Sequence, residues 1–218
     1  MKNAAPSVFR MILVPSLITL GITVLRLIGE LQNWPEPLFK KSAGGFGSIV
    51  GIAWLALVFA IYFAIRLENA GKSFASTGKA IGFTVLSLIL CFGGLSLFFH
   101  GGNSPSPLFQ LAGILVGLGS IAAMRFAWPA YWNVMLAYAL AARIPVIIIA
   151  YLAMQGNWGT HYDVAPPGSS YPDWQTKFLQ IGLYPQIFLW IPFTMTLCGL
   201  FGIITVAIRK RRPVPATA

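Results

Sequence analysis

Residues 11–31, MILVPSLITLGITVLRLIGEL, decide the fold, because this run stays apolar for the length of a bilayer crossing. A hydrocarbon core about 30 Å thick is crossed by about 20 predominantly apolar residues in a helix. In lipid the backbone must satisfy its own N–H and C=O groups, so such a run is helical. The run follows a basic start, as in a signal peptide. It is too long for a typical signal peptide, and no small-residue cleavage site follows it, so we predict a retained first helix.

Five further runs have the same character, and together they predict an all-α, polytopic transmembrane helical bundle of about six spans. The expected spans are residues 11–31, 44–65, 79–99, 107–124, 128–154 and 178–208. One transmembrane domain would occupy residues 1–212, with a polar outer loop at 155–177 and a disordered tail at 213–218. The last two runs exceed one perpendicular crossing, so we expect kinks at Pro145 and Pro192.

The composition excludes a soluble domain and makes membrane lipid the expected partner. Apolar residues are 57% of the chain and charged residues only 9%, against about 25% charged residues in an ordinary soluble domain. A net charge of +10 would suggest nucleic acid in a soluble protein. No basic patch interleaved with aromatic residues is present, so nucleic acid is rejected as a partner. Lys and Arg gather instead in the loops of membrane proteins, where they set orientation.

The charge distribution predicts that both termini are cytoplasmic (N-in/C-in). Ten of the 15 Lys and Arg then fall on the inner side: Lys2, Arg10, Arg66, Lys72, Lys79, Arg125, Arg209, Lys210, Arg211 and Arg212. Only Lys40, Lys41 and Lys177 fall on the outer side, in accord with the positive-inside rule. We therefore expect a multi-pass protein of a cell (plasma) membrane, and short loops without a large soluble domain favour a prokaryotic one.

Four basic residues follow the last predicted span directly: Arg209, Lys210, Arg211 and Arg212. We interpret them as a stop-transfer anchor at the lipid surface that fixes orientation. Specific binding of anionic lipid is the alternative interpretation.

Charges inside the predicted spans indicate a candidate site. A charged side chain at mid-bilayer costs at least about 2.5–3.5 kcal/mol, so such residues are rare and tend to be functional. Arg26 and Arg143 each lie fifteen residues into their spans, which places both about 22 Å from the inner edge. Glu30 follows Arg26 by four residues and so shares its helical face. Gln186 lies about 12 Å in from the outer edge of the last span.

The outer loop supplies two more candidates, His161 and Asp163, which would cover this cluster. Arg26, Glu30 and Arg143 carry a net charge of +1, so our hypothesis is an outward-facing pocket for a small anion or a lipid headgroup. Two structural alternatives stay open. The arginines could extend to the outer headgroups, or they could form an ion-pair network that only fixes helix register.

The sequence carries no signature of an enzyme. The zinc motif His-Glu-x-x-His is absent, and Cys91 and Cys198 lie in apolar runs without metal-ligand spacing. No catalytic residue, metal ligand or cofactor is therefore predicted. His161 and Asp163 are of the residue types that act as a general base and the carboxylate that orients it, but no activated nucleophile accompanies them.

Three classes of function remain. The first is a non-enzymatic scaffold or accessory subunit, in a homo-oligomer or a larger membrane complex. The second is a small carrier or receptor for an anionic or amphipathic ligand, and the third is an intramembrane enzyme. Small-residue pairs at spacing four, which allow close helix approach, are Gly47/Gly51, Gly78/Gly82 and Gly113/Gly117. We interpret them as intramolecular packing sites, with a dimer face as the alternative.

Overall fold

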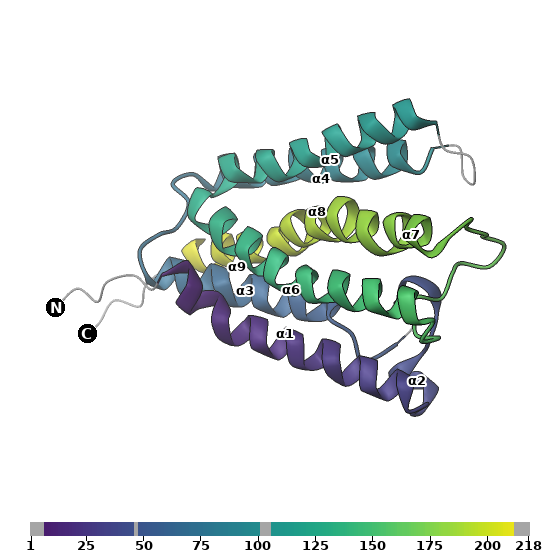
Figure 1. The fold of residues 1–218 in the computed structure, drawn as a ribbon. Helices are drawn as coiled ribbons and strands as arrows, with labels where there is room; N and C mark the ends of the chain where they lie inside the picture. Colours follow the sequence, from purple (N-terminus) through teal and green to yellow (C-terminus); the bar gives the residue numbers. More distant parts are fainter. Residues whose placement is uncertain (1–6, 46–47, 101–105, 212–218) are drawn as a thin grey trace.

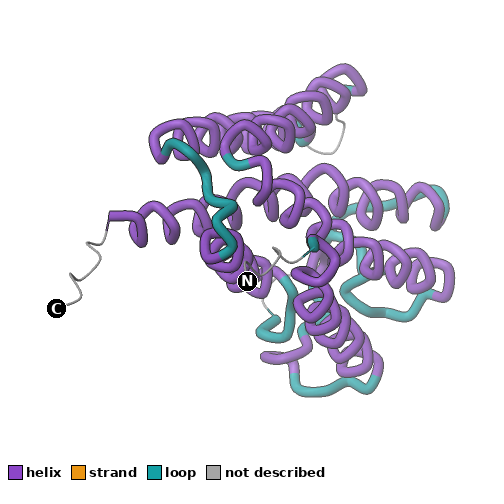
Figure 2. Tube along the Cα trace, turned by 90° about the vertical axis from the view of Figure 1, so that its left-hand side faces the viewer, coloured by secondary structure: helices purple, strands orange, loops and turns teal. Residues whose placement is uncertain are grey.

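The computed structural model describes residues 7–45, 48–100 and 106–211, and within these ranges the chain is helical with no strand (Figures 1 and 2). The helices before the last span are α1 (Val8–Leu31), α2 (Glu36–Phe39), the short turn η1 (Ala43–Gly45), α3 (Ala53–Asn69), α4 (Thr77–Phe98), α5 (Pro107–Ala127) and α6 (Pro129–Gly156). The all-α bundle is thereby confirmed. The predicted tail at 213–218, Arg212 and Gly47 lie outside the described residues.

The last helical segment, Trp174–Arg211, contains several π-helical turns. It comprises α7 (Trp174–Lys177), η2 (Phe178–Leu183), η3 (Gln186–Trp190), α8 (Ile191–Phe193), η4 (Thr194–Cys198) and α9 (Gly199–Arg211). The expected kink residue Pro192 lies in α8, between the π-helical turns η3 and η4. A proline removes one amide donor, and wider turns are one way for a helix to accommodate that loss.

Five of the described helices are long and apolar enough to cross a membrane: α1, α4, α5, α6 and the segment Trp174–Arg211. The chain is therefore a multi-pass membrane protein by the length and composition of its helices. Helix α3 has 17 residues, or about 25 Å, which is at the lower limit for a crossing. The sixth span stays a prediction.

The predicted span 44–65 is wrong at its start. The helix begins only at Ala53 and extends to Asn69, while Gly44 and Gly45 adopt φ values of 69° and 74°. Positive φ is the left-handed region that glycine reaches without steric cost and that interrupts a right-handed helix. The segment before α3 is therefore a loop, and it packs at one end of the bundle.

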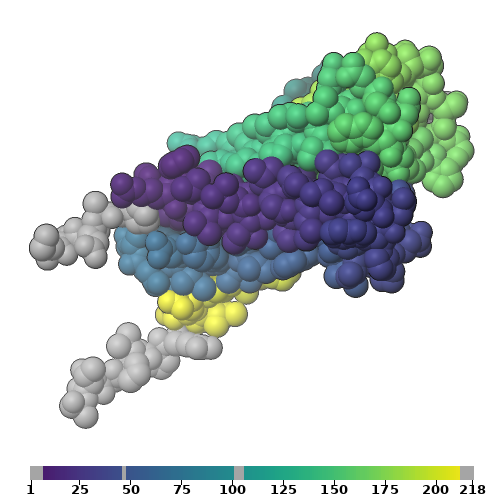
Figure 3. Space-filling model, turned by 60° about the horizontal axis from the view of Figure 1, so that its bottom comes forward, coloured from purple at the N-terminus to yellow at the C-terminus, as the bar shows by residue number. Residues whose placement is uncertain are grey.

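The bundle has two ends, which we call proximal and distal. Helix α1 begins and α9 ends at the proximal end, whereas α2 and the end of α6 lie at the distal end (Figure 1). Helix α1 packs between α6 and α3, and the loop after α1 covers the distal end (Figure 3).

Helix α6 forms the centre of the bundle, and hydroxyl groups join it to its neighbours. Thr19 of α1 and Tyr138 of α6 share a hydrogen bond of 2.9 Å between their hydroxyls. Tyr131 of α6 donates to the carbonyl oxygen of Ala60 in α3 at 3.0 Å. Lipid is as apolar as a leucine side chain, so close packing and such interhelical hydrogen bonds hold the helices together.

Helices α4 and α5 form a hairpin along one side of the bundle, and glycines let their backbones touch (Figure 1). A Cβ atom at Gly113 would lie 2.5 Å from the backbone nitrogen of Phe98 and 2.6 Å from the carbonyl oxygen of Gly94. A Cβ atom at Gly94 would lie 2.7 Å from the backbone nitrogen of Gly117. Two of the predicted small residues, Gly113 and Gly117, thus pack within the chain, whereas Gly78 and Gly82 have no close neighbour.

We expect Gly113→Ala to destabilise the protein by about 1–3 kcal/mol, because the added methyl group meets backbone atoms that cannot rotate away. Gly119→Ala is the matched control on the same helix, since a Cβ there has no neighbour within 4 Å. The free energy of unfolding of both variants is measured in mixed micelles of mild and denaturing detergent. Equal stability of the two variants would contradict the close packing of the hairpin.

Candidate functional site

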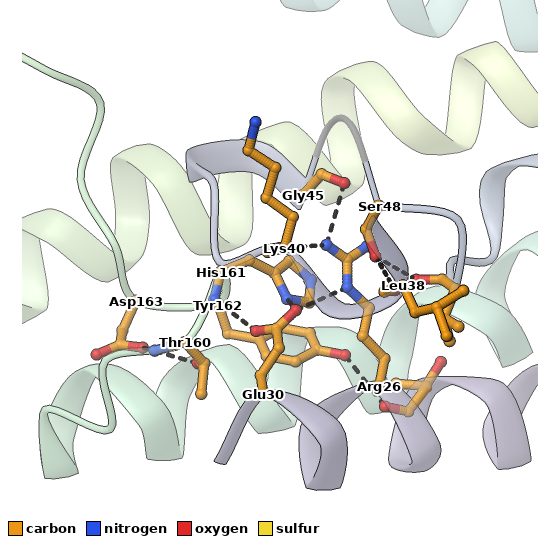
Figure 4. A network of polar contacts seen from close by, with 12 residues as sticks. Arg26, Glu30, Leu38, Lys40, Gly45, Ser48, Thr160, His161, Tyr162 and Asp163 are labelled. Carbon is orange, nitrogen blue, oxygen red and sulfur yellow. Dashed lines mark hydrogen bonds and ion pairs between the residues drawn. The ribbon is translucent and has the colours of Figure 1, made fainter. Parts of the chain in front are cut away.

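Arg26 and Glu30 form a buried ion pair on the last turns of α1. The Arg26 Nε donates to Glu30 Oε1 at 2.8 Å, and the Glu30 side chain has no exposed surface. The i, i+4 spacing predicted from the sequence places the two groups on one face of the helix. The Arg26 Nη2 also donates to the carbonyl oxygens of Lys40 at 3.3 Å and Gly45 at 3.1 Å (Figure 4). Arg26 is therefore neutralised by Glu30 and enclosed by the loop before α3.

The contact between Arg26 and the loop before α3 is possible because Gly45 has no side chain. Gly45 lies so near that a Cβ there would come within 3.1 Å of Arg26 Nη1 and 2.8 Å of the His161 ring. Sequence reasoning missed this segment, although the Gly44-Gly45 pair was a signal that a helix could not continue there. Ser48, also in this loop, donates its hydroxyl to the carbonyl oxygen of Leu38 and holds the loop against α2.

Glu30 also holds the distal loop, residues 157–173, onto α1. The backbone N–H of His161 donates to Glu30 Oε2 at 2.8 Å, and His161 Nδ1 lies 2.6 Å from Glu30 Oε1. A carboxylate only accepts hydrogen bonds, so Nδ1 carries the proton and Nε2 is the acceptor of the neutral ring. The hydroxyl of Tyr162 donates to the carbonyl oxygen of Thr23 at 3.3 Å and adds a second contact to α1.

The local environment favours the neutral form of His161. Burial lowers the pKa of its imidazole; the hydrogen bond to Glu30 raises it, and the Arg26 guanidinium lowers it further. The balance is a pKa below the usual value, so the ring is neutral at neutral pH. Arg26, Glu30 and His161 together then carry no net charge.

Arg143 of α6 is buried but much less well satisfied than Arg26. Its side chain donates from Nη1 to Gln186 Oε1 at 3.3 Å, and its guanidinium carbon lies 4.7 Å from the centre of the Trp190 ring. Only 5% of Arg143 is exposed, and its Nε has no hydrogen-bond partner among the described residues. An orphaned buried donor costs about 1–3 kcal/mol, and more on a charged group. No carboxylate in the described part of the chain forms an ion pair with it.

One partly open cavity of about 530 Å³ joins the two arginines. Its wall includes Arg26 of α1, Arg143 of α6, Gln186 of η3 and His161 of the distal loop. The equal depth predicted for Arg26 of α1 and Arg143 of α6 stays a prediction. Both side chains nevertheless face one space.

Four of the six predicted ligand-binding residues line this cavity, and two do not. Glu30 lies behind Arg26 and His161 and contacts both. Asp163 is not in the cavity wall; its carboxylate accepts from the backbone N–H groups of Gly159 and Thr160 at 2.9 and 2.7 Å. Asp163 therefore shapes the distal loop, and Glu30, not Asp163, is the carboxylate that orients His161.

The predicted basic anchor makes intramolecular contacts at the proximal end. Arg209 forms an ion pair with Glu68 at 2.5 Å. Lys210 donates to the carbonyl oxygen of Phe74 at 2.6 Å and lies 4.2 Å above the Phe74 ring. These contacts fasten α9 to the end of α3 and the following loop, so two of the four residues have structural partners.

In the described ranges no three His, Cys, Asp or Glu side chains come together as a metal site would require. Cys91 and Cys198 are buried free thiols. Fold and site together define the chain as a multi-pass, all-α membrane protein with a cavity among its helices that two buried arginines line. No protein-family model, no curated protein and no solved structure matches the chain.

We expect Glu30→Gln to destabilise the protein by about 3–5 kcal/mol, because it leaves the Arg26 charge buried without its partner. Glu36→Gln is the control, since Glu36 is exposed on α2. Detergent-induced unfolding followed by circular dichroism compares the two. A loss in Glu30→Gln no larger than in the control would contradict the role assigned to this ion pair.

Acidification should lower the thermal stability through His161. Its pKa in the folded protein is below that of the unfolded chain, so the unfolded state binds more protons between these two values. The contribution of neutral His161 to the free energy of unfolding is fully present above about pH 6.5, the pKa in the unfolded chain. This contribution falls as the pH drops toward the pKa in the folded protein. We expect His161→Gln to reduce this dependence of the melting temperature and His100→Gln, at an exposed turn, to retain it. An unchanged profile in His161→Gln would refute the assignment.

Proposed function

We propose that the protein binds a small anionic ligand in the cavity between Arg26 and Arg143, as a carrier or receptor of the membrane. Arg143 carries this proposal, because it is a buried cation that lines the cavity without an ionised partner in the described residues. Glu30 neutralises Arg26, and His161 is neutral, so the wall retains one positive charge. A ligand with one negative charge would balance it.

The comparison between the two arginines supports binding over a purely structural network. A structural arginine is expected to have its donors satisfied by carboxylates and carbonyl oxygens, as Arg26 does with three hydrogen bonds. Arg143 has five N–H donors and one hydrogen bond in the described residues. A cavity of about 530 Å³ is also within the usual range for small-molecule sites. A sealed ion-pair network would have no such volume.

The orientation of the bundle in the membrane is part of the same proposal. Arg66, Arg125 and Arg209 lie near helix ends at the proximal end, and Lys40 and Lys177 belong to distal elements. By the positive-inside rule the proximal end is cytoplasmic, and the cavity faces the outer side of a cell membrane.

The proposal predicts that monoanions stabilise the wild-type protein and that Arg143→Gln weakens the effect. A ligand that binds only the folded state raises the melting temperature with concentration. Thermal unfolding in mild detergent is measured against a panel of carboxylates and phosphodiesters of different sizes. Loss of a charged hydrogen bond should weaken binding about tenfold to a hundredfold.

Arg125→Gln is the matched control, because Arg125 is exposed at the end of α5 and does not line the cavity. It should bind the panel as the wild type does. The proposal is overturned if no anion binds the wild type more tightly than Arg143→Gln. Recovery of a stoichiometric partner chain together with that result would favour the scaffold or accessory subunit.

A further inference from the structure

We infer that the ligand of this cavity is amphipathic and lipid-derived, an inference that rests on the proposed anion site. Its anionic head would lie at Arg143, and its apolar tail would leave the cavity between α3 and α4. The head would be a carboxylate or a phosphodiester, since both carry one negative charge and accept hydrogen bonds from a guanidinium. The inference depends on three features of the cavity: its wall, its mouth and the helix turn beside Arg143.

The wall is apolar away from the charged end. Ile22 of α1, Val146 and Ala150 of α6 and Leu189 of η3 line it beside the two arginines. A small hydrated ion makes no use of such a surface, whereas an acyl chain is stabilised by burial against it. Ligand sites of this composition fix orientation with a few polar groups and bind mainly through apolar contact.

The mouth of the cavity is apolar as well. Ala53 and Trp54, at the start of α3, and Phe99, at the end of α4, line the cavity and are exposed. Trp54 is 51% exposed and Phe99 is 55% exposed, so this part of the wall continues onto the outer surface of the helices. In a bilayer that surface would meet lipid, because the spanning helix α4, which ends beside Phe99, exposes its apolar side to acyl chains. A tail could therefore stay in the hydrocarbon while its head reaches Arg143.

The helix turn whose side chains contact Arg143 is π-helical. Gln186 and Trp190 both belong to η3, and both contact the Arg143 side chain. Pro185 precedes this turn and has no N–H to donate. π-Helical turns recur in this segment, in η2 and η4 as well, so the contacts of Gln186 and Trp190 are what distinguish the turn beside Arg143. Here the wide turn faces one amide and one aromatic ring toward the same guanidinium.

The experiment compares ligands with one head and different tails on the full chain in mild detergent. Acetate, octanoate and dodecanoate form a carboxylate series, with dodecanol as the neutral analogue. Dimethyl phosphate and lysophosphatidylglycerol form a phosphodiester pair. We expect affinity to rise more than about tenfold from the short to the long member of at least one series, and dodecanol not to compete. The series that shows the rise identifies the head.

The route of the tail is tested by narrowing the mouth. Ala53→Trp should reduce octanoate binding to the level of acetate and leave acetate binding unchanged, which also shows that the variant is folded. Val58→Trp is the control, because Val58 is exposed five residues further along α3 and does not line the cavity. A length dependence that survives Ala53→Trp would overturn the exit between α3 and α4.

The outcomes separate this inference from the proposed function. If acetate and dimethyl phosphate bind as tightly as their long-chain counterparts, the site takes small anions, and the lipid inference is wrong while the proposed function stands. If no anion of either length binds in an Arg143-dependent way, both are wrong.

Discussion

A single carboxylate, that of Glu30, organises the distal end of the bundle. It has no exposed surface, yet it accepts the Nε–H of Arg26, the backbone N–H of His161 and the Nδ1–H of the same histidine. Isolated charges are expensive at this depth, so the carboxylate needs the guanidinium, and the guanidinium needs the carboxylate. The histidine contacts tie a loop 131 residues away to the end of α1. Helix α1, the distal loop and the loop before α3 thus meet at one ion pair, with the distal loop on Glu30 and the loop before α3 on Arg26.

Helix α3 is short, and the loop before it forms part of the cavity wall. Helix α6 has 28 residues and α3 has 17, a difference of about 16 Å along the bundle. A regular helix over residues 44–65 would fill more of the distal space beside α1. The chain instead passes Gly44 and Gly45 in left-handed conformations and sends two carbonyl oxygens to Arg26. The loop that satisfies Arg26 thus also lines the cavity that Arg143 faces.

The features that sequence reasoning predicted are those that lipid or local geometry imposes. Bilayer thickness dictates the apolar runs, which is why the spanning helices could be read from the chain. The helix period pairs Arg26 with Glu30, and no structure is needed to see it. The Glu30–His161 contact joins residues 131 positions apart, and no spacing rule reaches that far. Asp163 was assigned to the pocket because it follows His161 by two residues, whereas its carboxylate caps its own loop. The start of α3 was misplaced because apolar content outweighed two adjacent glycines.

The contrast between the two arginines is an argument about stability. For packing alone, an apolar side chain of similar size at position 143 would contact Trp190 as well and would carry no desolvation cost; buried ion pairs are often replaced by apolar groups without loss. Arg26 fits a structural role, since a carboxylate and two carbonyl oxygens surround it. Arg143 has one long hydrogen bond, one aromatic face and an orphaned Nε. The fold thus bears the cost of a charge at the wall of a cavity, and a bound anion is the simplest partner that would offset it.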